Sequence, residues 1–332
     1  MLPPLVLAPT YRRYLWGGRR FAVELGRDLP PGDDYAESWE LVDRGAEQST
    51  VATGPLAGTG LGPRVRERGR DLRGRAAPLP AFALLFRFLD ARLDLSVQVH
   101  PDDARAARLA PPDRGKTEAW YVVDAAPGAR IWAGTTPGVD APAFAAALRA
   151  GRIVEVLHSF EPRPGDCVFI PAGTVHAIGA GLLVAEIQQS SDVTYRLHDW
   201  DRVGPDGTPR PLHVAAGLDA VTRFGPVAAV TPAATPDPAV HRLVACEPFL
   251  FDEVRPQAAG RWGVGGDDGC HFLAVIAGRV RLEDRWSLPS LGRGRCVLIP
   301  ASAGRQTLTA GPDDRGDPPR LLHVALPPAA AA

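Results

Sequence analysis

Short apolar runs alternate with turn residues along most of the chain. The runs are rich in Val, Ile, Leu and aromatic residues, and glycine or proline separates one run from the next. Short runs bounded in this way are typical of buried β-strands, whereas helices need longer periodic segments. The pattern therefore predicts an all-β protein of the sandwich or barrel type. The expected strands are 93–99, 119–123, 167–170, 182–188, 193–197, 271–276, 279–282, 296–299 and 321–325.

Helical patterns are few. Residues 141–150 have a proline near the start and a glycine just past the end, which is the usual arrangement at helix termini. Residues 102–109 form a second, shorter candidate. Segments 16–18 and 38–40 are interpreted as turns around a packing aromatic residue. Residues 59–79 are rich in arginine and glycine without interleaved aromatic residues, so we expect a solvated loop or edge rather than a nucleic-acid site.

One stretch of sequence recurs 129 residues later in the chain. Residues 165–176 (GDCVFIPAGTVH) match residues 294–305 (GRCVLIPASAGR), and upstream of them 119–123 match 271–275. Self-similarity at this distance predicts two related β domains. His176 of the first copy is replaced by Arg305 in the second, so a metal site that uses His176 cannot recur there.

The repeat gives a domain division. We expect a catalytic, metal-binding domain at 1–225 with an N-terminal extension, and a degenerate second domain without metal at 241–332. Residues 226–240 are rich in proline and alanine and are the expected linker.

Composition excludes several classes of protein. The 332 residues are 45% hydrophobic and 23% charged, with a formal net charge of −1. Nucleic-acid binding is not expected, because binders show a clustered basic excess. The apolar stretches are far shorter than the roughly 20 residues of a membrane span, and the N-terminus lacks the basic region of a signal peptide. Four cysteines without CxxC spacing indicate reduced thiols, so the expected location is cytoplasmic.

One count stands out within that composition. Of the 37 basic side chains, Lys116 is the single lysine and all others are arginine. Arginine replaces lysine readily on a solvated surface, but arginine cannot give up its proton. Lys116 is therefore a functional candidate. The alternative is chance survival of one surface lysine.

Three short segments carry groups that bind metal ions. Gln98 and His100 are two residues apart, as are Lys116 and Glu118, and this spacing places both members of a pair on one face of a strand. His176 follows a Pro-x-Gly turn. An amide oxygen, two imidazoles and a carboxylate form a mixed set that suits Zn²⁺ or another first-row divalent ion. Taken singly, each of these residues is more often structural.

Arg196 is the candidate for binding an anion. Alternation along 193–198 places Thr194, Arg196 and His198 on one face, and an arginine inside a barrel is costly unless it meets a negative group. The alternative is an ion pair at the rim with Asp199 or Asp201.

Several of these segments together resemble the class I mannose-6-phosphate isomerases of the cupin superfamily, in their short bacterial form. Residues 165–176 fit the cupin pattern G-x5-P-x-G-x2-H at every fixed position. Residues 95–103 resemble the family's glutamine–histidine metal motif, 115–122 its lysine–glutamate motif, and 188–202 the segment that holds its active-site arginine.

The resemblance implies a fold, a cofactor and an activity. The fold is all-β, with two cupin-like β-barrel (jelly-roll) domains and a few short helices. The activity is the interconversion of mannose 6-phosphate and fructose 6-phosphate through a cis-enediol, with one zinc ion per chain, in a monomer or weak homodimer. The implied metal ligands are Gln98, His100, Glu118 and His176, the implied catalytic residues are Lys116 and Arg196, and the implied substrate contacts are Lys116, Arg196 and Ser96.

Two other functions stay open: a metal-containing cupin that binds sugars without turnover, and an iron dioxygenase of the same superfamily.

Overall fold

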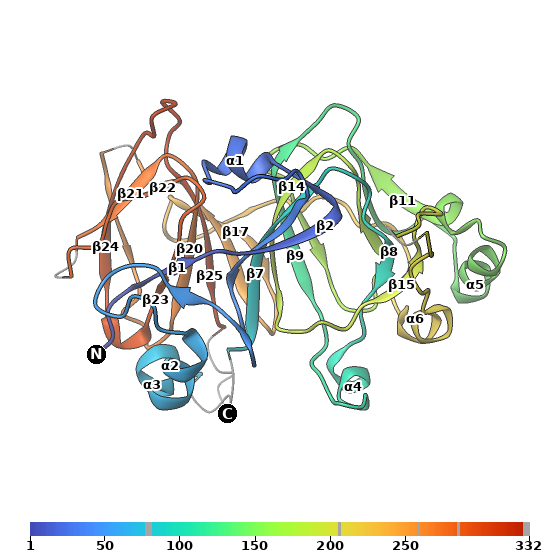
Figure 1. Cartoon of the computed structure of the whole chain (residues 1–332), viewed down its shortest axis with the longest axis horizontal. Coiled ribbons are helices and arrows are strands. Elements are labelled where there is room, and N and C mark those ends of the chain that lie inside the picture. Colours follow the sequence, from blue (N-terminus) through green and yellow to red (C-terminus); the bar gives the residue numbers. More distant parts are fainter. Residues whose placement is uncertain (77–81, 205–206, 258, 284–285, 328–332) are drawn as a thin grey trace.

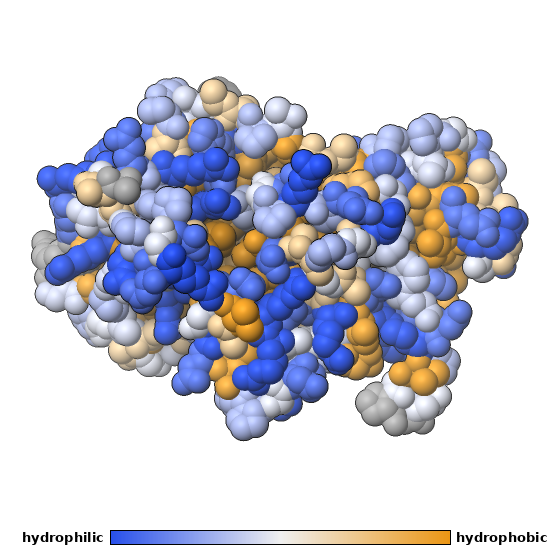
Figure 2. All heavy atoms as spheres, turned by 90° about the horizontal axis from the view of Figure 1, so that it is seen from above, coloured by the Kyte–Doolittle hydropathy of each residue, from blue (hydrophilic) through white to orange (hydrophobic). Residues whose placement is uncertain are grey.

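Two β units lie side by side in the computed structural model, which describes residues 1–76, 82–204, 207–257, 259–283 and 286–327 (Figure 1). All the strand pairs within the sheets are antiparallel, and the helices are short and peripheral. The expected all-β class with few helices is confirmed. Polar and charged residues cover most of the face seen in Figure 2, with apolar residues between them in small groups.

The first unit consists of two sheets with an apolar core between them. One sheet has the order β12-β9-β14-β7-β3-β2 and the other β11-β10-β13-β8-β15. Trp120 of the first sheet and Ile131 of the second belong to the same buried cluster. The strands of the first sheet are β2 (Thr10–Gly18), β3 (Tyr35–Leu41), β7 (Leu84–Ala91), β9 (Glu118–Ala125), β12 (Cys167–Ile170) and β14 (Leu182–Gln189). Those of the second are β8 (Val97–Val99), β10 (Ile131–Thr135), β11 (Leu157–Phe160), β13 (His176–Ile178) and β15 (Tyr195–His198).

The second unit has the same two-sheet plan. Its larger sheet has the order β16-β17-β18-β25-β20-β23-β1-β6 and its smaller sheet β19-β24-β21-β22. The larger sheet contains β1 (Leu5–Ala8), β6 (Thr50–Val51), β16 (Ala233–Ala234), β17 (Val240–Ala245), β18 (Leu250–Val254), β20 (His271–Ala277), β23 (Cys296–Ile299) and β25 (Arg320–Ala325). The smaller sheet contains β19 (Arg261–Val264), β21 (Arg279–Leu282), β22 (Leu291–Gly292) and β24 (Gln306–Gly311). A separate hairpin pairs β4 (Asp43–Arg44) with β5 (Glu47–Gln48).

The two units share one core. Phe86 of β7 and Phe272 of β20 lie with their ring centroids 4.8 Å apart, in a buried cluster drawn from the larger sheets of both units. The division into domains at 1–225 and 241–332 stays a prediction, and strand pairing refines it. β1 and β6 lie in the sheet of the second unit, where β1 pairs with β23.

The expected linker, 226–240, contacts both units. Val230 N–H donates to Cys167 O over 2.7 Å in the first unit, and β16 pairs with β17 in the second. The segment therefore lies along the first unit before it enters the second unit's sheet.

The helices are α1 (Arg20–Leu25), α2 (Leu61–Glu67), α3 (Gly69–Arg73), α4 (Asp103–Ala106), α5 (Ala141–Arg149) and α6 (Val214–Ala220). The helix expected at 141–150 is confirmed as α5, whose first turn is capped by the Asp140 carboxylate. The helix expected at 102–109 is present in shortened form as α4, capped by Asp102. Among the described residues, no helix combines the length and apolar character needed to cross a bilayer.

The prediction of a solvated loop at 59–79 is wrong for its described part. Residues 61–73 form α2 and α3, and Leu61, Val65 and Leu72 are buried in the core shared by the two units. The spacing of these apolar residues fits one face of a helix, but the arginines between them hide it in the sequence. Residues 77–79 lie outside the described residues.

The interpretation of 16–18 and 38–40 as turns is also wrong. Residues 16–18 end β2, and residues 38–40 lie inside β3, which is buried along its whole length. The polar residues Ser38 and Glu40 obscured the strand pattern: the Ser38 hydroxyl donates to Glu40 Oε1 within the strand, and Glu40 has a further partner outside it. Arg27 donates to Glu40 Oε1 over 2.8 Å.

The internal repeat corresponds to equivalent strands. β12 pairs with β9 as β23 pairs with β20, and Cys167 and Cys296 begin the two repeat strands. In this register Ile170 faces Glu118, whereas Ile299 faces His271. The sequence alignment of 119–123 with 271–275 is therefore shifted by one residue relative to the strand pairing. In the structure, His271 occupies the position that corresponds to Glu118.

Candidate metal centre and active-site cavity

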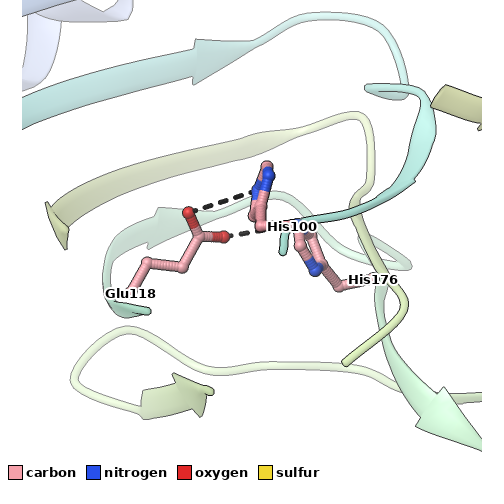
Figure 3. A group of neighbouring side chains, drawn as sticks. All are labelled: His100, Glu118 and His176. Carbon is pink, nitrogen blue, oxygen red and sulfur yellow. Dashed lines mark ion pairs between the residues drawn. The ribbon is translucent and has the colours of Figure 1, made fainter. Parts of the chain in front are cut away.

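Three predicted ligands converge in the first unit. His100, Glu118 and His176 are all buried, and one ligand atom from each lies within 4.8 Å of the other two (Figure 3). His100 Nε2 is 3.6 Å from Glu118 Oε2, and His176 Nε2 is 3.3 Å from Glu118 Oε1. Glu118 begins β9, His176 begins β13, and His100 directly follows β8, so the two facing sheets bring the three together.

Backbone carbonyls orient both imidazoles. His100 Nδ1 donates to Val193 O and His176 Nδ1 donates to Thr174 O, each over 2.9 Å. A proton held at Nδ1 leaves Nε2 as the free acceptor of each ring, and both Nε2 atoms face Glu118. Burial lowers the pKa of His176 to about 4, and burial together with Lys116 lowers the pKa of His100 well below its usual range. Both rings are therefore neutral at neutral pH, as metal ligation requires.

The Glu118 carboxylate is buried beside one cation, Lys116, and is also a suitable ligand for a metal ion. Burial raises the pKa of Glu118 to about 7 although Lys116 acts against the shift, and neither carboxylate oxygen has a well-aligned hydrogen-bond donor among the described residues. Ligand atoms about 2.0–2.1 Å from a tetrahedral zinc ion lie roughly 3.4 Å apart, close to the 3.6 Å and 3.3 Å between the Glu118 oxygens and the two imidazoles. Two imidazole nitrogens and a carboxylate thus fit a zinc ion in both donor type and spacing.

Gln98 lies beside this group. Its Nε2 atom is 3.3 Å from His176 Nε2, and Gln98 faces His176 in the pairing of β8 with β13. Rotation of the amide by half a turn would present the oxygen in place of the nitrogen. The role of Gln98 as a fourth ligand stays a prediction.

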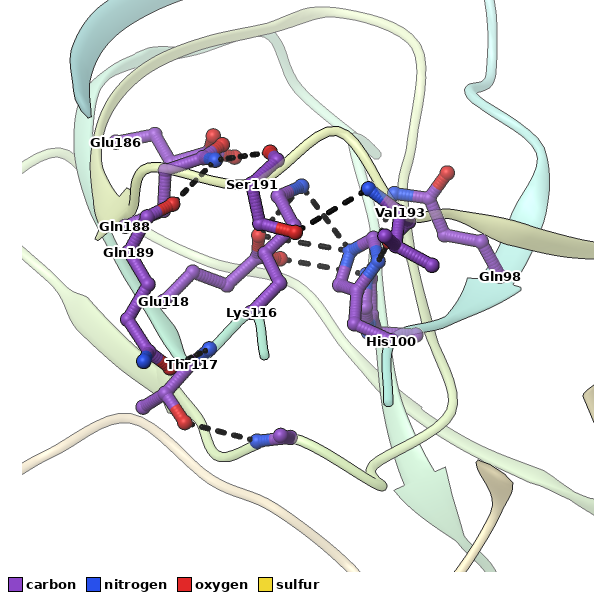
Figure 4. Close-up of polar contacts among 12 residues, drawn as sticks. Gln98, His100, Lys116, Thr117, Glu118, Glu186, Gln188, Gln189, Ser191 and Val193 are labelled. Carbon is purple, nitrogen blue, oxygen red and sulfur yellow. Dashed lines mark hydrogen bonds and ion pairs between the residues drawn. The ribbon is translucent and has the colours of Figure 1, made fainter. Parts of the chain in front are cut away.

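Lys116 is buried beside the candidate metal ligands. Its Nζ atom is 3.1 Å from His100 Nε2 and 3.0 Å from Glu118 Oε2 (Figure 4). The side chain is 3% exposed, so the alternative of a surface lysine that survived by chance is wrong. Lys116 precedes β9 and reaches the same site as Glu118, as their spacing predicted.

Arg196 faces the cavity without a carboxylate partner. Its Nη1 donates to Pro211 O over 2.8 Å, and its buried Nε has no hydrogen-bond partner among the described residues. In that part of the chain no ion pair joins Arg196 to Asp199 or Asp201; Asp199 pairs with Arg202 and Arg210 instead. The rim ion pair is therefore not formed, and burial and Arg210 lower the pKa of Arg196.

A cavity of about 300 Å³ joins these residues. Ser96, Gln98, Lys116, Thr194 and Arg196 all line it. Thr194 and Arg196 share a face as predicted, but His198 packs against Trp200 instead, because the pairing of β15 with β8 shifts register after Arg196. The N-terminal strands β2 and β3 add an aromatic wall of Tyr14, Trp16 and Trp39.

Sequence reasoning missed a buried charge network in this cavity. Arg87 pairs with Glu186 over 2.7 Å and with Glu37 over 2.8 Å, and Trp120 Nε1 donates to Glu186 Oε2. Burial alone would raise the pKa of Glu186, but the Arg87 charge outweighs it and lowers the pKa. A signal was present, because Arg87 and Glu186 each lie between apolar residues of a strand, where an unpaired charge is costly.

Comparison with known proteins gives consistent results. A family model described as phosphomannose isomerase type I, catalytic domain, matches residues 5–119. The chain is 36% identical to a protein of Bacillus subtilis (strain 168) named "Probable mannose-6-phosphate isomerase GmuF", over 93% of this chain and 96% of that relative. It is 33% identical to a mannose-6-phosphate isomerase of Streptococcus mutans serotype c, over 90% and 93% of the two chains. The crystal structure of the mannose 6-phosphate isomerase from Bacillus subtilis superposes with a TM-score of 0.86 at 28% identity, covering 97% of this chain and 99% of that one.

Proposed function

The chain belongs to the type I phosphomannose isomerase family, and from that premise we propose that it is a zinc-dependent isomerase that interconverts mannose 6-phosphate and fructose 6-phosphate through a cis-enediol. The observation that carries the proposal is the buried group of His100, Glu118 and His176, with Lys116 beside it at the wall of a polar cavity. The substrate is a small phosphosugar. A monomer or weak homodimer and a cytoplasmic location stay predictions.

His100, Glu118 and His176 would hold the zinc ion, with Gln98 as the proposed fourth ligand. A bound zinc ion supplies Lewis-acid polarisation of substrate oxygen atoms. The carbonyls of Val193 and Thr174 hold the imidazoles in the orientation that this binding needs.

Lys116 is the proposed proton-transfer group. Isomerisation moves a proton between C2 and C1, and a lysine can lose and regain a proton where an arginine cannot. Nζ lies within 3.1 Å of both His100 and Glu118, so a substrate at the metal centre would be within its reach. The competing role is contact with the phosphate group as a fixed charge.

Arg196 and Ser96 are the proposed substrate contacts. Arg196 has a permanent charge, a place on the cavity wall and a buried Nε that no described residue contacts by a hydrogen bond, all of which suit an anionic oxygen of the substrate. Ser96 lies on the same wall, with its Oγ 3.4 Å from Gln98 Oε1, and can contact a substrate hydroxyl.

The two alternative functions fit less well. An iron dioxygenase cupin favours three histidines and one glutamate, whereas the cluster among the described residues has two histidines and one glutamate. A sugar-binding cupin without turnover has no need of a lysine buried beside the metal ligands.

Metal analysis combined with a coupled assay tests the proposal. The purified protein should contain one zinc ion per chain and convert mannose 6-phosphate to fructose 6-phosphate. Removing the metal with a chelator should abolish turnover, and adding zinc should restore it. A metal-loaded protein that binds the phosphosugar without converting it would contradict the proposal and favour the sugar-binding alternative.

A further inference from the structure

Gln188 presents an unpaired amide oxygen at the active-site cavity. It lies on β14 directly opposite Glu118 of β9, so the two side chains share a face of the sheet. The residue is 1% exposed and lines the cavity, and its Oε1 has no hydrogen-bond donor among the described residues.

The orientation of this amide is fixed by its nitrogen. Gln188 Nε2 donates to Gln189 O over 2.8 Å and to Ser191 O over 3.0 Å (Figure 4). Both partners are backbone carbonyls, which only accept hydrogen bonds. The nitrogen must therefore point to these carbonyls, and the oxygen must point away from them.

Among the described residues, no neighbouring side chain donates a hydrogen bond to Gln188 Oε1. Glu118, opposite Gln188 on β9, and Glu186, two residues before Gln188 on β14, are carboxylates, and the Ser191 hydroxyl donates to Arg114 O over 2.8 Å. Lys116 Nζ faces His100 and Glu118. Leaving a buried acceptor without a hydrogen-bond donor costs free energy. A donor that enters with the substrate would remove this cost.

We propose that Gln188 Oε1 accepts a hydrogen bond from a hydroxyl group of the sugar phosphate, which makes Gln188 a specificity-determining residue. The inference rests on the proposed function and extends it to the polyol part of the substrate. A site built to bond a hydroxyl rejects an analogue that lacks it, because the buried acceptor is then left unpaired.

The test is a double-mutant cycle between one enzyme side chain and one substrate hydroxyl. Mannitol 6-phosphate cannot isomerise, so its dissociation constant reports binding alone. We would measure this constant by calorimetry for mannitol 6-phosphate and for three analogues that lack the hydroxyl at C3, C4 or C5. The proteins are the zinc-loaded wild type and Gln188→Met, which keeps the length of the side chain but has no amide.

The wild type should bind one of the three analogues at least about 10-fold more weakly than the parent compound. Gln188→Met should bind the parent more weakly, and its preference for the parent over that analogue should shrink to less than about threefold. The same loss of discrimination should appear in kcat/KM with the matching mannose 6-phosphate analogues.

Gln189→Met is the matched control. Its amide accepts from Thr117 N–H over 2.9 Å and donates to Asp103, away from the cavity lining. This variant should lose stability or turnover but keep the wild-type preference among the analogues. A structural role for Gln188 alone would weaken binding of all four compounds equally, which would overturn the proposal.

Two further outcomes overturn the inference independently of the proposed function. One is equal binding of all four compounds to a wild type that isomerises mannose 6-phosphate. The other is wild-type discrimination in Gln188→Met, or in Gln188→Leu if the methionine variant does not fold. A wild type that fails to isomerise mannose 6-phosphate would refute the proposed function instead.

Discussion

Lys116 shows at the scale of one residue how composition and geometry support each other. It is the single lysine of the chain, and it is buried within 3.1 Å of both His100 and Glu118. Burying an ammonium group is costly unless other groups compensate for its lost hydration. The Glu118 carboxylate offsets that cost here, so a cation is tolerated between two of the proposed metal ligands.

Lys116→Arg tests whether the cation must also release a proton. We expect the variant to fold, keep its zinc and bind the phosphosugar, with kcat about 10²-fold lower, the scale of a lost general acid–base group. Steady-state kinetics with metal analysis would check this. If Lys116 contacts the phosphate as a fixed charge instead, kcat would stay close to normal and KM would rise.

Arg196→Ala separates a substrate contact from a metal ligand. Zinc content should stay at the wild-type value while kcat/KM falls by about 10²-fold or more, because the side chain faces the cavity and not the metal ligands. Arg202→Ala is the matched control, since Arg202 pairs with Asp199 outside the cavity lining. Its kinetics should stay near normal, and equal losses in both variants would argue against a direct role for Arg196.

At the scale of helices and strands, short-range sequence patterns predict some elements and miss others. The repeat strands β12 and β23 and helix α5 follow directly from short-range signals, namely bounded apolar runs and a capped, proline-initiated turn. β3 does not, because it is buried on both faces by segments far away in the sequence.

Some residues of the candidate site could likewise be predicted from the sequence, and others could not. His100, Glu118 and His176 could be identified from their spacing and from the family resemblance. The Gln188 oxygen, which has no donor among the described residues, could not, because its direction depends on the backbone carbonyls of Gln189, at the end of β14, and of Ser191, just beyond it. That arrangement arises only in the folded chain.

Asp90 at the end of β7 gives an expectation for pH dependence. Burial raises its pKa to about 6, against the opposing effects of the Arg20 N–H, which donates to Asp90 Oδ2 over 2.7 Å, and the Arg20 charge. The folded state therefore holds the proton more tightly than the unfolded chain, whose pKa is about 3.9. The resulting stability is complete below about pH 4 and is lost as pH rises through about 6.

Asp90→Asn removes the titrating carboxyl group, so the variant is the reference against which the wild type is compared. The free energy of unfolding of the wild type should fall relative to the variant between about pH 4 and 6, by at most about 3 kcal/mol. Urea unfolding of both proteins across this range measures the difference. A difference that does not change with pH would show that Asp90 has the same pKa in both states.

At the scale of the whole molecule, two equivalent units carry different chemistry. His271 occupies the position that corresponds to Glu118. His323 occupies the position that corresponds to Glu186, because it lies opposite Leu273 in the second unit as Glu186 lies opposite Trp120 in the first. The two histidines are hydrogen-bonded to each other and to carboxylates on either side. His271 Nδ1 lies 2.9 Å from His323 Nε2, and the outer nitrogens of the pair contact Asp267 over 2.8 Å and Asp252 over 3.1 Å.

Metal content should therefore be one equivalent per chain, held by the first unit. His100→Ala and His176→Ala should each lose most of the zinc and the activity with it. His271→Ala should keep both and show only a lower free energy of unfolding, because it breaks a hydrogen-bonded chain rather than a metal site. Two tightly bound equivalents in the wild type would contradict this expectation.

The pairing of β1 with β23 has a consequence for synthesis of the chain. Leu5 lies opposite Leu298, so β1 is synthesised long before the strand with which it pairs. At about 5–20 residues per second, β1 waits roughly 15–60 s for that partner. During that interval β6 is already available to pair with one edge of β1, but the edge that β23 covers has no partner strand. Chaperones that recognise unpaired apolar strands would therefore act on β1 before the carboxyl-terminal strands emerge.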